Sequence, residues 1–213
     1  MSEPQPPDAP APRKRPFWQD PFVIAFAIGV VVLTALPSLQ RLFLKAPPPI
    51  SALPAWSLPG LADGGEVSSA SFKGKVLLLE LVPGPGCDAA CLERQRTFGN
   101  AVGHTDDLGG LVHLVTLAAP GTEEALAPLV VPGSRWHLAV AEPDGVLVRA
   151  LREGWWQWAH TDAGATGEDF AHLPAVILVD QDNALRGFWK DDPAGRGNAI
   201  NGARLLAKHG AKP

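Results

Sequence analysis

The longest apolar run of the chain lies near its start. The stretch Pro21–Gln40, PFVIAFAIGVVVLTALPSLQ, contains no charged residue. It is apolar on every side of a helix, and a helix needs about 20 such residues to cross a bilayer. We therefore predict a transmembrane anchor over residues 20–44. A buried core helix and a cleavable signal peptide are the alternatives, but no A-x-A cleavage site follows, and Pro37 with the bulky residues after it suits an uncleaved anchor.

Beyond residue 58 the apolar residues come in short runs that are typical of buried strands. These runs are KVLLLELV at Lys75–Val82, LVHLVTLA at Leu111–Ala118 and AVILVD at Ala175–Asp180. The segment Asp182–Trp189 follows the last run through an Asp-Asn turn and is expected to pair with it as a hairpin. Helices are expected between the strands, at about Asp88–Val102, Thr122–Leu129 and Asn198–His209.

Strands that alternate with helices and then close on a hairpin predict an α/β domain, with a mixed sheet and helices on both of its faces. The Gly-rich segment GLADGG at Gly60–Gly65 predicts a hairpin turn. It is not expected to bind a nucleotide, because no helix opens after it.

Four segments organise the chain. Residues 1–16 are Pro-rich and end in the basic cluster Arg13–Arg15, which indicates a disordered cytoplasmic tail. After the anchor, residues 45–58 form a Pro-rich linker of extended character, and residues 59–213 form one domain.

Basic residues flank both ends of the apolar run, three before it and two, Arg41 and Lys45, after it. This bias favours an N-in, C-out orientation. The Pro-rich tail, which carries Glu3 and Asp8, differs from an Arg- and Ser-rich mitochondrial transit peptide. We therefore expect a single-pass protein of a bacterial inner membrane, with the domain in the periplasm.

Composition narrows the chemistry. The formal net charge of −4 gives no basic face for nucleic acid, so no nucleic-acid partner is expected. Two cysteines are too few for a disulfide-stapled mini-domain or a zinc ribbon. The only methionine is the initiator, so a soft-metal site must use cysteine and histidine.

The two cysteines, Cys87 and Cys91, lie where the strand KVLLLELV passes through a PGPG loop into a helix. A helix start stabilises an anion, so a thiol at Cys87 ionises more readily there. Cys91 follows at i+4 on the same helical face. The pair can form a local disulfide or bind one soft metal ion. Functional sites gather at such strand-to-helix points of α/β sheets, which favours this interpretation over two inert buried cysteines.

Three sequence segments carry a resemblance to a known family. They are WSLPGLADGGEVSSASFKGKVLLLELV, then C-D-A-A-C, and later HLPAVILVDQDNALRGF. They resemble the Sco/SenC family of thioredoxin-like copper chaperones. Its pattern is F-x-L-x-(D/G)-x-x-G-x-x-V, F-K-G-K-V-x-L-L-x-F, C-P-x-x-C-P and D-H-(S/T)-x-x-x-(Y/F)-L-(I/V)-x-P-D-G.

This resemblance implies a thioredoxin-like mixed sheet flanked by helices over residues 59–213, behind an N-terminal transmembrane helix. It implies that Cys87 and Cys91 are thiolate ligands of copper, as Cu(I) or Cu(II), and that His172 is the histidine ligand. It also implies a copper-protein client, such as a respiratory oxidase subunit during cytochrome c oxidase assembly, and a thiol reductant as partners.

Several positions differ from the family pattern. Asp88 and Leu92 stand where the family has prolines, and Ala171 replaces the aspartate before the histidine. Pro174 directly precedes a strand, where thioredoxins keep a cis-proline that faces their redox pair. A thiol-disulfide oxidoreductase acting on a copper-protein partner is therefore the alternative, although C-x-x-x-C is one residue longer than the usual C-x-x-C. A third interpretation is a structural, membrane-tethered domain with an incidental disulfide.

The other histidines are assigned mainly structural or surface roles. His113 alternates within a strand and is expected to be a hydrogen-bonded strand residue. His104, His137 and His209 are expected at the surface, and His160 precedes the loop that leads to His172.

Three tryptophans, Trp155, Trp156 and Trp158, cannot all face one core from a helix, so at least one should be exposed. They either pack beneath a long loop or form a docking surface for a membrane partner.

Overall fold

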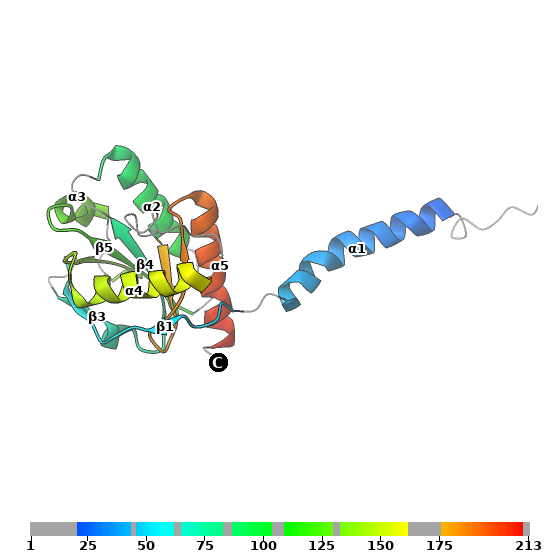
Figure 1. The fold of residues 1–213 in the computed structure, drawn as a ribbon. Coiled ribbons are helices and arrows are strands. Elements are labelled where there is room, and N and C mark those ends of the chain that lie inside the picture. Colours follow the sequence, from blue (N-terminus) through cyan, green and yellow to red (C-terminus); the bar gives the residue numbers. More distant parts are fainter. Residues whose placement is uncertain are drawn as a thin grey trace, which may run out of the picture. The chain divides into compact units, whose positions relative to one another are not determined.

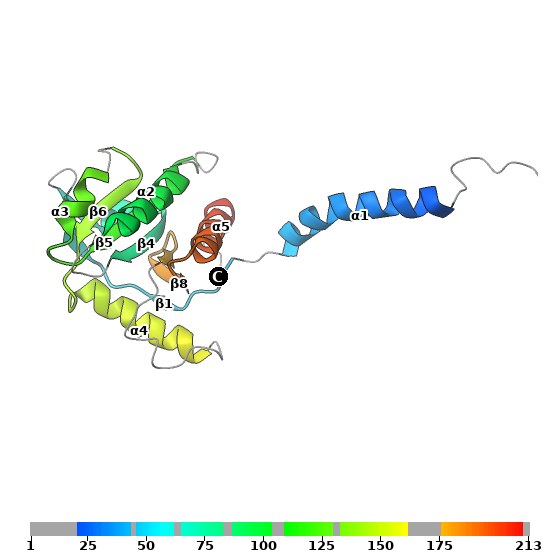
Figure 2. The same cartoon turned by 90° about the horizontal axis from the view of Figure 1, so that it is seen from above.

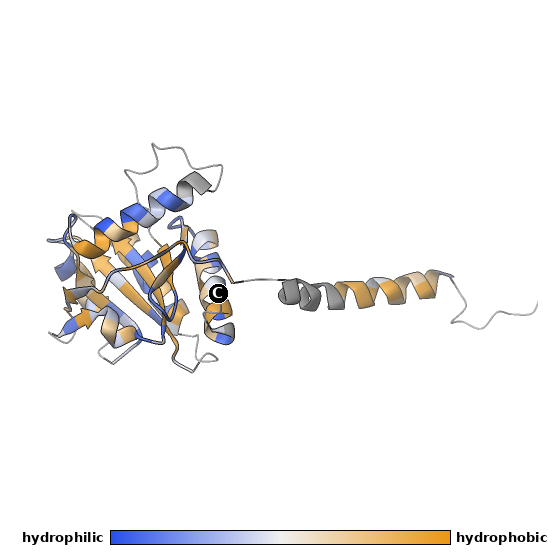
Figure 3. Ribbon diagram, turned by 60° about the horizontal axis from the view of Figure 1, so that its bottom comes forward, coloured by the Kyte–Doolittle hydropathy of each residue, from blue (hydrophilic) through white to orange (hydrophobic). Residues whose placement is uncertain are grey.

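The computed structural model describes residues 21–43, 46–61, 65–82, 87–103, 109–129, 133–161 and 176–210, with the backbone alone given for 35–43, 159–161 and 209. The chain divides into two compact units, Met1–Lys45 and Ala46–Pro213. In the first unit, helix α1 spans Pro21–Phe43, and Figure 3 colours much of its described length as hydrophobic. Several of its large apolar side chains, among them Phe22, Phe26 and Leu33, are exposed. Within the part of the chain that is described, no helix has both the length and the apolar character that a membrane span requires.

The second unit is built on a six-stranded mixed sheet with the strand order β1-β8-β7-β4-β5-β6. Figure 1 labels two of its neighbouring strands, β4 and β5. Strands β4, β5 and β6 are parallel, whereas β7, β8 and β1 continue the sheet in antiparallel pairings. The strands are β1 Ser51–Ala52, β4 Val76–Val82, β5 Val112–Ala118, β6 Trp136–Val140, β7 Val176–Val179 and β8 Ala184–Trp189. A separate antiparallel pair joins β2, Ser57–Pro59, to β3, Glu66–Ser68, which confirms the hairpin predicted around GLADGG.

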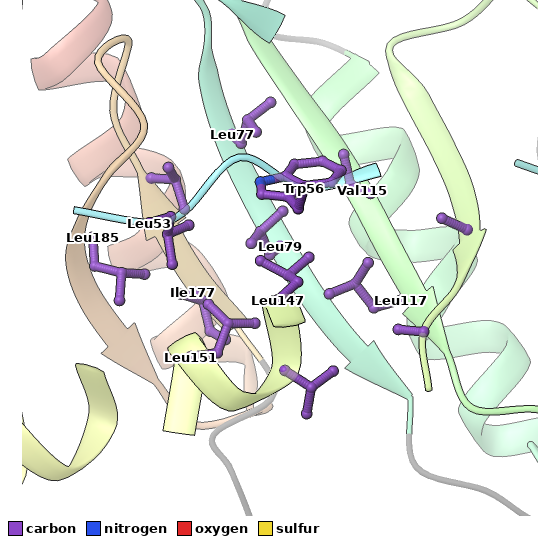
Figure 4. Packing of buried hydrophobic residues seen from close by; sticks show 14 of the residues in the cluster. Leu53, Trp56, Leu77, Leu79, Val115, Leu117, Leu147, Leu151, Ile177 and Leu185 are labelled. Carbon is purple, nitrogen blue, oxygen red and sulfur yellow. The ribbon is translucent and has the colours of Figure 1, made fainter. Parts of the chain in front are cut away.

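Helices cover both faces of the sheet. The helical elements are η2 Ser69–Phe72, α2 Ala89–Gly103, α3 Glu123–Leu126, η4 Ala127–Leu129, α4 Val146–Thr161 and α5 Pro193–His209. Helices α2 and α5 pack on one face and α4 on the other (Figure 2). Successive residues of a strand point to opposite faces, so Leu77 and Leu79 of β4 face α4, and Leu78 and Val82 face α2 and α5. Figure 4 shows the α4 side of this core, where Leu147 and Leu151 meet Leu79 and Ile177.

The three predicted strands, the hairpin and the predicted helices are all present, and the α/β prediction is confirmed. Helix α4 and strand β6 were not foreseen. The repeat of Leu147, Leu151 and Trp155 every four residues is a helical signal in retrospect, since it places all three on the buried stripe of α4.

The Pro-rich segment expected to act as a linker over residues 45–58 belongs instead to the domain. Leu53 and Trp56 are buried, and β1 pairs with the edge strand β8. Arg186, whose guanidinium pairs with the buried carboxylate of Asp180, also donates to the Pro47 carbonyl oxygen at 3.0 Å. These contacts agree with a compact unit that begins at Ala46. Prolines are compatible with a segment at the edge of a sheet, where a missing N–H donor is tolerated.

Helix α2 approaches the sheet closely at Gly99. A Cβ atom at this position would overlap the indole ring of Trp136 on β6, whose Nε1 donates to Thr116 Oγ1 at 2.9 Å. A Cβ at Gly197 on α5 would meet no atom within 4 Å. The absent side chain at Gly99 therefore sets how α2 lies on the sheet.

We expect Gly99→Ala to lower the free energy of unfolding by up to about 2 kcal/mol, because overpacking costs about 1–3 kcal/mol and the gain in helix propensity offsets about 1 kcal/mol of it. The matched change Gly197→Ala should raise stability by up to about 1 kcal/mol. Urea unfolding followed by circular dichroism measures both. Equal stabilisation by the two changes would contradict the close contact at Gly99.

Candidate redox and metal-binding site

Cys87 and Cys91 are joined by a disulfide, with their Cα atoms 5.2 Å apart. Cys87 lies just before α2 and Cys91 in its first turn, so the predicted position of the pair at a helix start is confirmed. Both side chains are half-buried and pack against the core between the sheet and helices α2 and α5. The pair thus has one side held in the core and one side open to solvent.

Asp88 is the N-cap of helix α2. Its carboxylate Oδ1 accepts a hydrogen bond from the Cys91 amide at 2.8 Å, and its carbonyl oxygen accepts from the Leu92 amide at 2.9 Å. This arrangement explains why an aspartate can stand where the Sco/SenC pattern has proline, since both residues suit a helix start. It also means that one of the free amides expected to stabilise a thiolate is already bonded to a carboxylate.

We expect Asp88→Ala to lower the free energy of unfolding by about 1 kcal/mol, the typical cost of losing an N-cap side chain. Asp88→Asn should be nearly neutral because asparagine caps as well as aspartate does. Chemical denaturation of the disulfide form tests both changes. An equal loss for alanine and asparagine would show that charge, rather than capping, carries the effect.

Beneath the cysteine helix lies a buried carboxyl group, Glu80 of β4. Alternation along the strand places it on the face that α2 and α5 cover. Its Oε1 accepts from Gln95 Nε2 of α2 at 2.9 Å and from Arg196 Nη2 of α5 at 2.7 Å. Its Oε2 has no hydrogen-bond partner among the residues that the structure describes. Burial raises the pKa of Glu80 to about 7, although the Arg196 guanidinium lowers it.

Arg196 ties this group to the rest of the site. Its Nη1 donates to the Arg94 carbonyl oxygen of α2 at 2.5 Å, and its Nη2 lies 2.6 Å from the Asp191 carboxylate. One guanidinium therefore links β4, α2 and α5 directly below the disulfide-bearing helix. Neither Glu80 nor Arg196 was predicted as a site residue, although a glutamate inside the apolar run KVLLLELV is a visible signal for Glu80.

The raised pKa of Glu80 has a consequence for stability. In the unfolded chain the group titrates near 4.5, so its contribution is fully present below that pH and is lost as pH rises towards 7. We expect the free energy of unfolding to fall across this window by up to about 3 kcal/mol relative to Glu80→Gln, because one pKa unit corresponds to about 1.4 kcal/mol. Urea unfolding at several pH values measures this difference. Glu93→Gln, an exposed change on α2, should follow the wild type, and a parallel course for Glu80→Gln would contradict the shift.

Two predicted site residues lie outside the described residues. They are His172, the expected histidine ligand, and Pro174. Within the described parts of the chain, no group of three or more histidine, cysteine, aspartate or glutamate side chains is placed to hold a metal ion.

Two further histidines and two of the tryptophans lie within the described residues. His113 is hydrogen-bonded within its strand environment, as expected. His137, expected at the surface, is instead half-buried and bonded to His113. Trp155 is 8% exposed and Trp156 is 50% exposed, which confirms that these tryptophans do not share one face.

Comparison with known proteins rests on structure. No family model matches the chain, and no curated protein matches it in sequence. Among solved structures, it is similar to BsSco, a member of the Sco family of cytochrome c oxidase assembly proteins, with 14% identity and a TM-score of 0.51, over 78% of this chain and 98% of that one. A SCO1/SenC family lipoprotein from Bacillus anthracis gives 14% identity and a TM-score of 0.50, over 77% and 99% of the two chains.

The chain has a Sco/SenC-like thioredoxin fold. A solution structure of a candidate protein disulfide isomerase from Bacteroides thetaiotaomicron is equally similar, with 15% identity and a TM-score of 0.50, over 78% of this chain and 96% of that one. At these identities the likeness establishes the fold and confirms the thioredoxin-like prediction. It does not separate copper delivery from disulfide exchange.

Proposed function

We propose that this chain is a membrane-anchored copper-binding chaperone for respiratory oxidase assembly that works through the Cys87–Cys91 pair. The observation that carries the proposal is a C-x-x-x-C disulfide at a helix start on a Sco/SenC-like thioredoxin fold. In this proposal the disulfide is the resting form of the pair, and reduction to two thiols allows the pair to bind copper as its cargo.

The donor set suits copper. Two thiolates whose Cα atoms lie 5.2 Å apart can converge on one ion once the disulfide is reduced. Thiolate sulfur is a soft ligand that favours Cu(I), and an imidazole would complete a three-coordinate site. In this proposal His172 supplies that imidazole, as the family resemblance implies. The client is a copper protein such as an oxidase subunit, and a thiol reductant keeps the pair reduced.

The proposal places the chain in a bacterial inner membrane, with its N-terminus in the cytoplasm and its domain in the periplasm. The exposed apolar side chains of α1, such as Phe22 at 81% and Leu33 at 75%, support an anchor, because a helix that is apolar on its surface needs an apolar environment. An oxidising compartment also suits a cysteine pair that forms a disulfide.

A second candidate function, thiol-disulfide exchange without stable metal binding, is favoured by the disulfide itself. Cys87 thiolate would attack a client disulfide and release one client thiol while forming a mixed disulfide. Cys91 would then attack the Cys87 sulfur, release the second client thiol and regenerate the Cys87–Cys91 disulfide. Two electrons pass from the pair to the client, and a thiol reductant must return two electrons and two protons.

Cu(I) titration of the reduced full-length chain in detergent separates the candidates. We expect a one-to-one complex that is lost in Cys87→Ser and Cys91→Ser. It should be weakened in His172→Ala by at least the roughly 10–100-fold that loss of an outer-shell partner costs at metal sites. A chelator of known affinity measures the binding, and His104→Ala is the control histidine variant. Negligible copper affinity with turnover of a disulfide substrate would favour the exchange function, and loss of stability alone would favour a structural role.

A further inference from the structure

A second group of chemically active side chains lies at the opposite end of the sheet. His113 is near the start of β5 and His137 near the start of β6, whereas the cysteine pair follows the end of β4. These three strands are parallel, so strand starts and strand ends lie at opposite edges of the sheet. The two histidines therefore form a site separate from the cysteines.

The hydrogen bonds determine the protonation of the pair. His113 Nε2 lies 3.0 Å from the Gly110 carbonyl oxygen, which only accepts, so this nitrogen carries the proton. His113 Nδ1 then offers a lone pair, and it lies 3.0 Å from His137 Nε2, which donates to it. His113 is held as a neutral imidazole whose Nδ1 lone pair accepts this hydrogen bond from its neighbour. Desolvation lowers the pKa of His113 to about 4, which keeps this form at neutral pH.

The surroundings resemble those of a ligating histidine. Metal-bound histidines usually donate their second ring N–H to a carbonyl or carboxylate, which fixes the ring and its tautomer. The Gly110 carbonyl already does this for His113. Phe72 packs against both imidazoles, with ring centroids 5.6 Å and 5.1 Å away. These contacts hold both rings in the hydrogen-bonded arrangement, from which the half-buried His137 ring must turn to direct its nitrogen at a shared ion.

A cavity gives access to His137, whereas the buried His113 does not line it. Its volume is about 290 Å³, and His137, Ser71, Ser134 and Glu66 contribute to its lining. It has room for water or a small anion to complete a coordination sphere. An ion bound beside His137 would therefore keep open coordination positions towards the cavity.

We propose that His113 Nδ1 and His137 Nε2 form a bidentate site for a divalent transition metal, with Cu²⁺ the preferred ion. Binding moves the His137 proton from Nε2 to Nδ1, so both ligands stay neutral and no redox step is involved. With metal–nitrogen bonds of about 2.0–2.1 Å, nitrogens 3.0 Å apart subtend roughly 95° at the ion. This is near the cis angle of tetragonal Cu²⁺, which also binds such ligands most tightly among the divalent ions of its row.

Positive charge opposes this site and supplies a test of it. Lys75 lines the same cavity, and both Lys75 and Arg135 contribute to the lowered pKa of His113. The same field repels a cation. Lys75→Gln is therefore expected to strengthen metal binding, an effect that a purely structural histidine pair would not produce.

The experiment uses the full-length chain in detergent with the Cys87–Cys91 disulfide intact, so that no thiolate competes. The background variant replaces His104, His160, His172 and His209 with glutamine, which also removes the histidine of the proposed copper site. We expect one Cu²⁺ per chain, with nitrogen hyperfine structure from two imidazoles in the electron paramagnetic resonance spectrum. Zn²⁺ should bind more weakly. Failure of this test leaves the proposed function unaffected, because the two sites share no residue.

In that background, His113→Gln and His137→Gln should each weaken Cu²⁺ binding by about tenfold or more, and Lys75→Gln should strengthen it. Circular dichroism checks that each variant folds. If His113→Gln does not fold, the half-buried His137→Gln decides the question. Cu²⁺ affinity that is unchanged in His137→Gln, or a spectrum without two nitrogen ligands, would overturn the proposal.

Discussion

The arrangement of the cysteine-bearing helix depends on one buried ionic contact, between Glu80 in the central strand and Arg196 of α5. Taking a carboxylate and a guanidinium out of water costs several kcal/mol per ion, which only close pairing and further hydrogen bonds offset. Arg196 meets this need by pairing with Glu80 and Asp191 and by donating to the Arg94 carbonyl oxygen. The same Arg196 interactions that offset the cost of burying charge therefore also hold α2 on the sheet. A change in the protonation of Glu80 would therefore first affect the helix that carries the cysteines.

A second buried pair works in the same way at the other side of the sheet. Asp180 accepts from the amides of Asp182 and Ala184, and so shapes the turn between β7 and β8, while its other oxygen pairs with Arg186. Arg186 in turn holds the Pro47 carbonyl oxygen. The hairpin and the Pro-rich entry to the domain thus depend on each other. The Pro47 carbonyl oxygen helps to satisfy the buried guanidinium, and this contact helps to order a segment that is poor in hydrogen-bond donors.

Local patterns were sufficient to predict what depends on local chemistry. The apolar runs of β4, β5 and β7 identified the strands, and the Asp-Asn turn identified the hairpin, because burial and turn geometry act on neighbouring residues. The Cys87–Cys91 pair was found because both of its members lie within one helical turn. What the sequence did not reveal depends on distant partners. From the sequence, Arg196 resembles an ordinary surface arginine, because its partner Glu80 lies far away along the chain. Residues 45–58 resemble a linker for the same reason, since their partners are Arg186 and β8.

The two ends of the sheet respond to protons in opposite ways. Burial raises the pKa of Glu80 from 4.5 to about 7, so its stabilising contribution is lost as pH rises through that interval. Burial lowers the pKa of His113 from 6.5 to about 4, so its contribution is complete above 6.5 and is lost as pH falls towards 4. Between about pH 4.5 and 6.5, Glu80 makes the free energy of unfolding fall with rising pH, whereas His113 makes it rise. The two effects oppose each other in the stability of the whole domain. The two ends therefore contribute opposite pH dependences to the stability of the domain, because exclusion of water disfavours the charged form of each group, and at Glu80 the Arg196 guanidinium offsets part of this effect.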